Sequence, residues 1–227
     1  MALLPEHLSK AAVGRERLSR QVIEAHQREH ILDAAVAIFA KRGYQGTTVD
    51  HLVAAAKIGV GSFYALFDGK EDCFLQAYDR IVSAASDQLA ATLPGDVPWP
   101  ERVCAFLRAS LALIAAEPLR ARVVLVEVQT AGSPALARYQ ATIDGLIAHL
   151  RHGRALSSRA AELPTTLEEA TVLGLAWLLH QRLVVGEVEE IEELFPDFAE
   201  ILLEPYLGEA DTKRLIAASI AASSPRA

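Results

Sequence analysis

Apolar residues recur every three or four positions through most of the chain, which is the period of an α-helix. The first clear stripe joins Ile31, Ala35, Ile38 and Phe39, and it stops at the run Lys41-Arg42-Gly43. Cations in a last turn followed by glycine are typical of a helix end. We therefore expect a helix that ends near residue 42.

Two short helices joined by a tight turn are predicted next. The apolar pattern covers 49–56 and 60–67, and the run Lys57-Ile58-Gly59 separates the two. Thr47 precedes the first of them, and Asp50 follows three residues later, which approximates a capping box. A helix, a three-residue turn and a second helix in about 20 residues are typical of a helix-turn-helix.

The remaining chain predicts only helices. A long one runs from about residue 70 to 93, and a proline- and glycine-rich linker follows at 94–100. Further helical stretches are expected at 101–115, 118–130, 134–153, 166–187 and 191–207, with a tail helix near 209–222. No alternating strand pattern is present. The expected fold is all-α, with a charged arm at 1–27, a three-helix helix-turn-helix domain at 28–75 and a helical bundle for ligand binding and dimerisation at 76–227.

Composition and charge narrow the class of partner. Hydrophobic residues make up 52% of the chain but aromatic residues only 6%, a bias toward Ala and Leu that favours helices. The net charge of −7 falls entirely on residues 81–227, since residues 1–80 carry ten cations and ten anions. A chain of this charge is no simple polycation, so any nucleic-acid interface has to be a local cluster of positive groups.

Two features bear on the compartment. Cys73 and Cys104 are too few and too far apart for a disulfide framework or a metal knuckle. Charged residues interrupt the N-terminus, and no uncharged run reaches the roughly 18 residues of a membrane span. We expect a cytoplasmic protein with no membrane partner.

The stretch from Arg28 to Tyr78 resembles the DNA-binding domain of the TetR family of transcriptional regulators. The resemblance rests on an ILDAA…F…GY opening, a TTV cap, an AA-x-x-G turn, a G-S-F-Y recognition helix and an F-x-x-KE start of the connecting helix. It implies a dimer that binds double-stranded operator DNA through its N-terminal domain. It also implies that a small-molecule effector occupies the C-terminal domain and releases the DNA.

Candidate DNA-binding residues follow from this resemblance and from the donors near the turn. The resemblance implies phosphate contacts for Thr48, Tyr64 and Lys70 and positions near the bases for the run Val60-Gly61-Ser62. Further donors that can fix the backbone come from the side chains around them. The full candidate set is Arg28, Thr47, Thr48, Lys57, Val60, Gly61, Ser62, Tyr64 and Lys70.

The motif departs from the usual family pattern at its turn. Lys57 replaces the turn glycine, Gly59 replaces a frequent serine cap, and Val60 replaces a frequent cation. Few groups remain for hydrogen bonds to bases, so readout is expected to rest on thymine methyl contacts and DNA shape. The arm leaves two alternatives open, a segment that reaches phosphates or a solvated helical extension. Its cations are Lys10, Arg15, Arg17, Arg20 and Arg28.

The helix at 166–187 has two apolar stripes, and a helix of that kind has to be buried on both. One stripe contains Val172 and Leu183, and the other contains Trp177 and Val184. The helix at 191–207 repeats the theme with Ile191, Phe195, Phe198, Leu202 and Tyr206. Together they favour a homodimer through these two helices, with a monomer built on one thick core as the alternative.

The resemblance implies an effector pocket inside the C-terminal bundle. Its candidate lining residues are Phe106, Leu107, Arg122, Leu125, Glu127, Gln129, Tyr139, Ile143, Trp177 and His180. Each aromatic residue has plain core packing as an alternative. Glu127, the best polar candidate, is as well explained by a structural ion pair with Arg122 or Arg138.

No motif for catalysis, a cofactor or a metal stands out, and the pair His149 and His152 lacks a third ligand at a helpful spacing. We therefore expect no enzyme activity. The leading hypothesis is a repressor that a small, mostly apolar effector releases from a palindromic operator. The alternative is a TetR-like dimer that binds a small molecule and has no sequence-specific DNA recognition.

Overall fold

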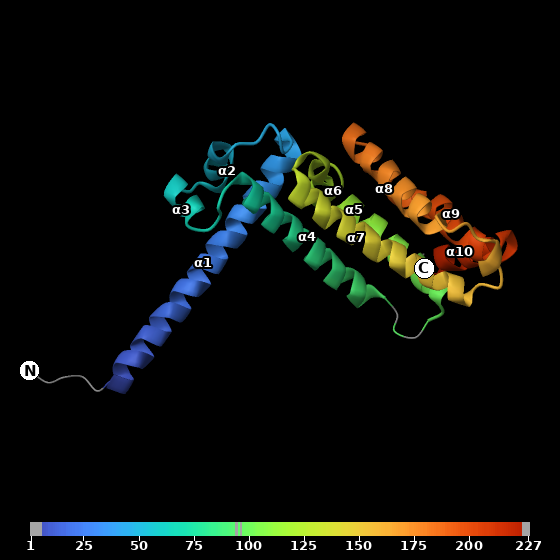
Figure 1. Cartoon of the computed structure of the whole chain (residues 1–227), viewed down its shortest axis with the longest axis horizontal. Coiled ribbons are helices and arrows are strands. Elements are labelled where there is room, and N and C mark those ends of the chain that lie inside the picture. The colour runs from blue at the N-terminus through green and yellow to red at the C-terminus, as the bar shows by residue number, and fades with distance from the viewer. Residues whose placement is uncertain (1–5, 94, 96, 224–227) are drawn as a thin grey trace, which may run out of the picture. The chain divides into compact units, whose positions relative to one another are not determined.

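The structure is a computed structural model, and it describes residues 6–93, 95 and 97–223, with side chains described from residue 22 to 222 (Figure 1). Within these ranges the regular structure is helical, as the sequence predicted. The α-helices are α1 (Glu6–Arg42), α2 (Val49–Ala56), α3 (Val60–Tyr64), α4 (Lys70–Thr92), α5 (Trp99–Ala116), α6 (Pro118–Leu125), α7 (Ser133–Arg151), α8 (Leu167–Val185), α9 (Phe195–Leu207) and α10 (Glu209–Ser223). Short 3-10 helices are η1 (Glu127–Thr130), η2 (His152–Leu156), η3 (Ala160–Glu162) and η4 (Glu192–Leu194).

The chain folds as two compact units, residues 1–77 and 78–227. The arm and the first domain helix expected from the sequence are one element, because α1 passes through position 28 without a break. The arm cations at positions 10–20 lie outside the residues whose side chains are described. Among the helices of the described ranges, none combines the length and apolarity that crossing a bilayer requires.

The core of the first unit is an aromatic cluster beneath α1. Ile31, Ala35 and Phe39 of the predicted stripe are each at most 1% exposed. The Phe39 ring meets that of Phe74 from α4 edge to face, with 5.1 Å between centroids, and Tyr44 joins at 5.1 Å from Phe74. Such aromatic pairs favour fixed ring geometry, so α1 and the start of α4 hold the two short helices in place.

Helix α3 is shorter than the pattern predicted. It ends at Tyr64 rather than Phe67, and Ala65 and Leu66 form a turn. The turn brings the rings of Phe63 and Phe67 to 5.2 Å between centroids, both within the core. The Phe67 N–H still donates to the Phe63 carbonyl at 2.9 Å, so the two rings lie one helical turn apart, as the spacing predicted.

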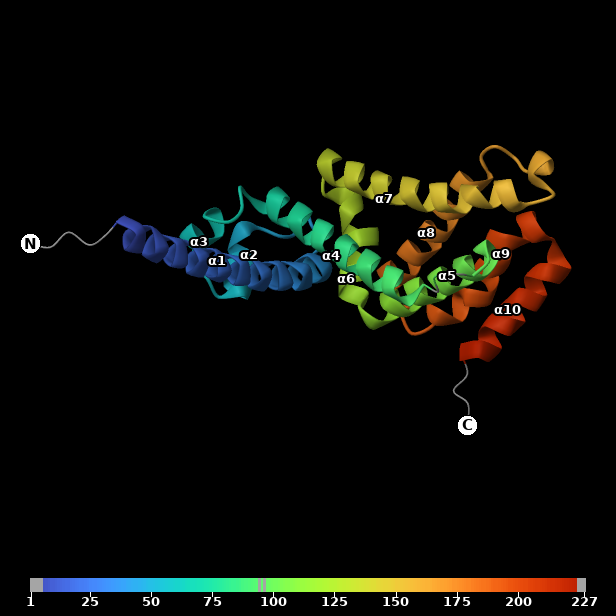
Figure 2. The same ribbon diagram turned by 90° about the horizontal axis from the view of Figure 1, so that it is seen from below.

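The second unit packs α8 against both α6 and α7, and α9 against α5 and α10 (Figure 2). Residues of α5, α7, α8 and α9 share one apolar core. The stripe of the 191–207 segment lies wholly within this core, with exposed fractions between 0 and 9%. A dimer contact through the 191–207 segment stays a prediction, but within the unit α5 and α10 cover this stripe. Its members are Ile191, Phe195, Phe198, Leu202 and Tyr206.

A buried carboxylate ties the second unit together. Glu168, at the start of α8, is 0% exposed, and its Oε1 accepts bonds from Arg154 Nε at 2.6 Å and Tyr206 Oη at 2.6 Å. Arg154 Nη2 donates to the other oxygen at 3.0 Å. Burial raises the pKa of the Glu168 carboxyl, but the hydrogen bonds from Arg154 and Tyr206 outweigh burial and set this pKa below its ordinary value. The network joins η2, α8 and α9.

Replacing Glu168 by glutamine is expected to lower the free energy of unfolding by about 3 kcal/mol at pH 7, because it leaves the Arg154 charge without its partner. A lowered folded-state pKa stabilises the fold above the unfolded pKa of about 4.3 and loses that effect as pH falls through the folded value. The difference between variant and parent should therefore shrink in acid.

Urea denaturation of the full chain at pH 7 and in acid measures both effects. The matched control is Glu169→Gln, because Glu169 pairs with Arg151 at 3.1 Å with both side chains about half exposed. Its loss should cost no more than about 0.5 kcal/mol. Equal losses for the two variants would contradict the assignment.

Candidate helix-turn-helix and effector site

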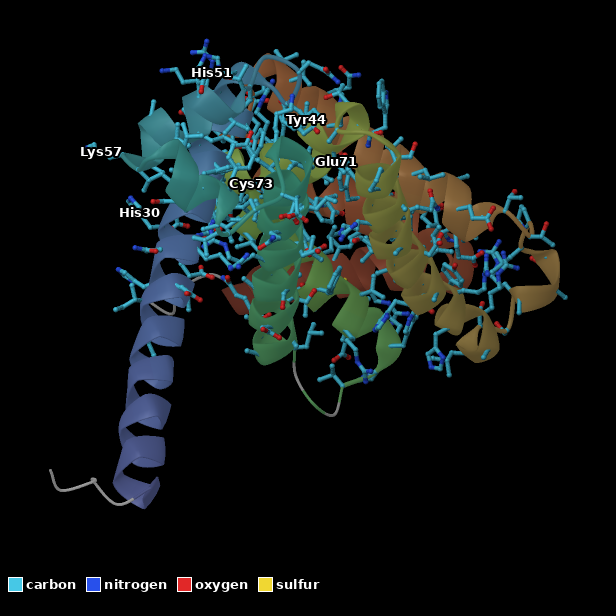
Figure 3. The ribbon with its side chains drawn as sticks, turned by 60° about the vertical axis from the view of Figure 1, so that its left-hand side comes forward. His30, Tyr44, His51, Lys57, Glu71 and Cys73 are labelled. Carbon is cyan, nitrogen blue, oxygen red and sulfur yellow. The ribbon has the colours of Figure 1, made fainter. Side chains whose placement is uncertain are left out.

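The N-terminus of α2 is held by Thr48 and His51 (Figure 3). Thr48 Oγ1 accepts the His51 N–H at 3.3 Å, and the Thr48 N–H donates to His51 Nδ1 at 3.2 Å. This is a capping box one residue later than the predicted Thr47 and Asp50 pair. Thr47 is 1% exposed and its hydroxyl donates to the Gly43 carbonyl at 2.7 Å. The structure thus presents Thr48, and not Thr47, at the surface.

The turn between α2 and α3 is built on Lys57. This residue lies at φ 53° and ψ 44°, in the left-handed region where glycine is the usual residue. Its N–H donates to the Ala54 carbonyl at 3.3 Å, and the Ile58 N–H donates to the Val53 carbonyl at 3.0 Å. These two bonds end α2, and the Lys57 side chain remains exposed at the outer end of the helix (Figure 3).

Helix α3 has one face in the core and one face in solvent. Phe63 is fully buried, whereas Val60 is 47% and Tyr64 55% exposed. Gly61 and Ser62 are exposed beside them. A side chain at Gly61 would meet no atom within 4 Å, so packing inside the domain does not require glycine there. The four residues that the sequence assigned to DNA on this helix are therefore all exposed.

Two other candidates make their contacts within the first unit. Arg28 donates to the Leu66 carbonyl at 2.9 Å and to Gln76 at 2.5 Å, and its guanidinium lies over the Phe67 ring. Its role as part of a DNA-reaching arm is not favoured by this geometry. Lys70 donates to the carbonyl of Tyr44 at 3.0 Å.

The Tyr44 side chain supports this anchoring of Lys70. The Lys70 ammonium lies 4.2 Å from the Tyr44 ring centroid, a favourable cation–π arrangement. Burial, and then the nearby Glu71 carboxylate, raise the pKa of the Tyr44 hydroxyl (Figure 3). The ring is therefore neutral, and Lys70, the first residue of α4, is held against Tyr44 with only part of its surface in solvent.

The ten effector candidates do not share one environment in the second unit. Leu107, Glu127 and Ile143 are buried, while Gln129 and Trp177 are exposed, Trp177 by 58%. Phe106, Arg122, Leu125, Tyr139 and His180 are half-buried. Gln129 and Tyr139 share a side-chain hydrogen bond.

Four of the candidates converge where α6, η1 and α8 meet. Arg122 Nε lies 3.2 Å from Glu127 Oε1, and Arg122 Nη1 donates to the Leu183 carbonyl at 2.9 Å. The His180 ring stacks on that of Trp177 at 4.9 Å between centroids. Arg122 is thus the ion-pair partner of Glu127, whereas Arg138 binds Asp79 at 2.9 Å.

Burial and the neighbouring charges determine whether the His180 imidazole is protonated. Burial, followed by the Arg122 charge, lowers the pKa of the imidazole, and Glu127 only partly offsets them. His180 is therefore neutral at pH 7. We call Arg122, Glu127, His180 and Trp177 the polar cluster.

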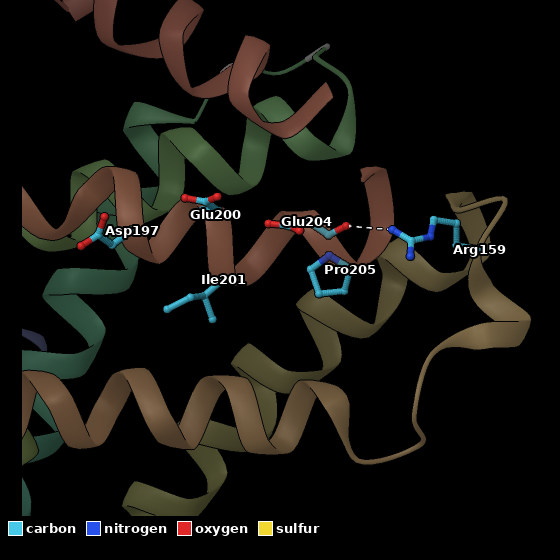
Figure 4. Close-up of a pocket in the computed structure, with 6 residues that line it drawn as sticks. All are labelled: Arg159, Asp197, Glu200, Ile201, Glu204 and Pro205. Carbon is cyan, nitrogen blue, oxygen red and sulfur yellow. Dashed lines mark hydrogen bonds between the residues drawn. The ribbon is translucent and has the colours of Figure 1, made fainter. Parts of the chain in front are cut away.

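Two surface hollows lie elsewhere in the second unit. One of about 610 Å³ follows the outer side of α9 (Figure 4). It is lined by Arg159, Asp197, Glu200, Ile201, Glu204 and Pro205. The other, of about 400 Å³, is lined by residues of α7 and α8 that include Ile147 and Leu173. Neither hollow contains an effector candidate, and the sequence analysis did not anticipate either one.

Substituting Lys57 by glycine is expected to stabilise α2 by about 1 kcal/mol, because glycine lacks the Cβ that strains a left-handed residue. Amide hydrogen exchange of α2 in the full chain measures the free energy of local opening. The control Ala54→Gly, in the exposed interior of the same helix, should cost about 1 kcal/mol. Slower exchange in the parent than in Lys57→Gly would show that the residue is not strained.

Solved structures of other proteins share the fold of this chain. The fatty acid degradation regulator FadR from Bacillus halodurans superposes with a TM-score of 0.68 at 20% identity, covering 78% of this chain and 94% of that one. A FadR structure from Bacillus subtilis in complex with stearoyl-CoA has a TM-score of 0.62 at 16% identity and covers 80% and 98%. At such identities the likeness concerns the fold.

Sequence comparison identifies the N-terminal domain. The model of the family "Bacterial regulatory proteins, tetR family" matches residues 31–77. The HTH-type transcriptional repressor DhaR of Mycobacterium sp. (strain GP1) is 33% identical over 66 residues, or 29% of this chain and 33% of that protein. The regulator YhgD of Bacillus subtilis (strain 168) is 29% identical over 73 residues, 32% and 38% of the two chains.

These matches span about a third of the length of the curated relatives. The family model falls on the part of the chain that contains α2 and α3. The relatives are named as transcriptional regulators and not as enzymes. Residues 31–77 therefore form a helix-turn-helix domain of the kind found in the tetR family of bacterial regulatory proteins.

Proposed function

We propose that this protein is a transcriptional repressor that binds a palindromic operator as a homodimer and leaves it when a small, mostly apolar effector binds. The observation that carries the proposal is the open face of α3, where Val60, Gly61, Ser62 and Tyr64 are all exposed next to a capped α2. A helix of this size can enter the major groove, which is about 12 Å wide.

Contacts to the DNA backbone come from the start of α2 and from Tyr64. The Thr48 oxygen accepts the cap hydrogen bond, so its own O–H is available to donate to a phosphate. The positive end of the α2 dipole adds to this attraction. Lys57 supplies an exposed cation at the other end of α2.

Readout of base sequence in this proposal depends on shape and apolar contact. Val60 can touch a thymine methyl, and Ser62 is the one hydroxyl on the outer face near the start of α3. Thr47 and Arg28 are engaged within the domain, which leaves few donors for base edges. Discrimination then comes in part from the sequence dependence of DNA deformation.

The dimer in this proposal forms through the outer face of α8. The five large apolar residues there are between 46% and 67% exposed in the single chain: Leu173, Trp177, Leu178, Val184 and Val185. The opposite stripe, with Val172, Leu175 and Leu183, is at most 9% exposed. An uncharged face of this length is costly in water, and a second copy would cover it through a two-fold interface.

The dimer supplies the symmetry that operator recognition needs, since two recognition helices about 34 Å apart read adjacent half-sites. Release requires an effector that prefers the arrangement unable to bind DNA. One solved neighbour is described with stearoyl-CoA, so acyl-CoA thioesters belong in a first effector screen.

The second candidate function is a small-molecule-binding dimer without sequence-specific DNA recognition. The engagement of Arg28 and Lys70 inside the domain favours it, because both are donors that DNA would otherwise use. Ala65 is also exposed and apolar on the same side of the chain as Tyr64. Binding to DNA would then be weak, salt-dependent and equal for all sequences.

Two conservative variants separate the backbone contact of α3 from its base contact. Tyr64→Phe removes one phosphate donor and should weaken binding by about fivefold on operator and scrambled DNA alike. Val60→Ala removes a base contact and should weaken binding to the operator alone, by about fivefold. Fluorescence polarisation with the DNA that flanks the protein's own gene, at two salt concentrations, measures both.

The parent protein supplies the control in the same titration. Tighter binding to the flanking DNA than to its scrambled copy is expected, with the difference kept at moderate salt. Equal affinity for the two DNAs, with a steep salt dependence for both, would refute the repressor and support the second candidate.

Leu173→Glu is expected to weaken the dimer at least about tenfold, because it places a charge in an apolar interface. Leu156→Glu is the matched control, since Leu156 is 61% exposed but lies on η2, away from the α8 face. Sedimentation equilibrium of the full chain measures the dissociation constant. A parent that remains monomeric at micromolar concentration would remove the dimer from the proposal.

A further inference from the structure

We propose that the polar cluster is the polar end of the effector site and that it binds an uncharged hydroxyl, as in an apolar alcohol or a phenol, in preference to a carboxylate. This inference rests on the proposed function, since it specifies which chemical class the effector belongs to. Three features carry it: two unpartnered buried nitrogens, the charge balance of the cluster, and its aromatic and aliphatic surroundings.

The first feature is unusual in a folded interior. Among the described side chains, the buried nitrogens without a hydrogen-bond partner are Arg122 Nε and His180 Nδ1, and both belong to the polar cluster. Arg122 Nε lies near Glu127 without a well-directed hydrogen bond, while Nη1 is already bound to the Leu183 carbonyl. Leaving a buried polar group without a hydrogen bond is unfavourable, and a ligand oxygen that reaches these nitrogens would restore their hydrogen bonds.

The second feature is the charge of the site. Arg122 and Glu127 form an ion pair, and His180 is neutral because burial and the Arg122 charge lower its pKa. The cluster therefore has no net charge. A carboxylate bound here would bring a second anion beside Glu127 and leave one negative charge uncompensated in a poorly solvated place.

A hydroxyl meets the hydrogen-bonding needs of both nitrogens. Its oxygen accepts the Arg122 Nε–H, and its proton goes to His180 Nδ1 when the imidazole carries its own hydrogen on Nε2. With the hydrogen on Nδ1, the same oxygen accepts from both nitrogens. A carbonyl oxygen fits only the second of these tautomers, so a hydroxyl is favoured.

The third feature is the apolar surface around the cluster. The Trp177 and His180 rings are nearly parallel, with 9° between their planes. Leu125, Val126 and Leu179 are partly buried against the same core. A ligand whose body is a hydrocarbon or an aromatic ring would cover the leucine and valine side chains, and only its hydroxyl would need polar partners.

Three probes with one carbon skeleton test the assignment: 4-propylphenol, propylbenzene and 4-propylbenzoate. Isothermal titration calorimetry on the full chain at pH 7.5 is expected to give at least about tenfold tighter binding of the phenol than of either other probe. His180→Phe keeps the ring stacking and removes the nitrogens, so it should lower phenol affinity about tenfold and leave propylbenzene unchanged.

His152→Phe is the matched control, because His152 is an exposed histidine outside the cluster. It should leave all three affinities unchanged, and circular dichroism verifies that both variants fold. Each of three results would overturn the inference: benzoate binding as tightly as the phenol, phenol and propylbenzene binding equally, or none of the probes binding at millimolar concentration.

Operator binding without any probe, followed by fluorescence polarisation, separates this inference from the proposed function. If the operator is bound and some other molecule releases it with an affinity unaffected by His180→Phe, the repressor stands and the hydroxyl site is wrong. If the phenol binds as expected but no DNA is bound specifically, the hydroxyl site stands and the repressor is wrong.

Discussion

Helix α8 has apolar residues on two faces, and its own unit can bury only one of them. The stripe with Val172, Leu175 and Leu183 completes the core formed with α5, α7 and α9, while the Leu173 and Val184 side stays uncovered. Glu168 fixes the start of the same helix through Arg154 and Tyr206. Both proposals for the second unit therefore depend on this helix, since the dimer uses its open face and the polar cluster uses His180 at its edge.

The small DNA-binding domain is organised by local hydrogen bonds around a few aromatic rings. Thr48 and His51 begin α2, Lys57 ends it in a left-handed conformation, and Phe63 anchors α3 below. A helix of five residues fixed at one buried ring presents little surface, so each outward residue matters more than in a longer recognition helix. An apolar Val60 at that surface fits a mode of recognition in which the DNA backbone supplies affinity and groove shape supplies much of the specificity.

The second unit uses its charged residues mainly for internal structure. Glu127, Arg138 and Glu168 each lie in an ion pair with a residue from another element. The polar cluster differs from the other two pairs because two of its buried nitrogens make no hydrogen bond inside the protein. These missing hydrogen bonds, and not a large cavity, distinguish a candidate binding position from a structural ion pair in this bundle.

The sequence by itself determined the helices, most of their ends and the resemblance of the N-terminal domain to tetR regulators. Helical spacing, prolines and glycines specify these locally, and α2 begins and ends where the pattern predicted. The two stripes of α8 could also be counted from the sequence. The sequence also indicates Glu127 as the best polar candidate, although it leaves open the choice between Arg122 and Arg138 as its partner.

Only the tertiary structure decided which side chains are exposed and which are engaged within the fold. Thr47 and Thr48 are adjacent and chemically alike, yet the fold buries one and exposes the other, because the chain turns between Gly43 and α2. Arg28 and Lys70 turn toward carbonyl groups 38 and 26 residues away, and the stripe of α9 is covered by α5 and α10. Helical periodicity says that a face is apolar, but what covers that face depends on elements distant in sequence, and those meet only in the folded chain.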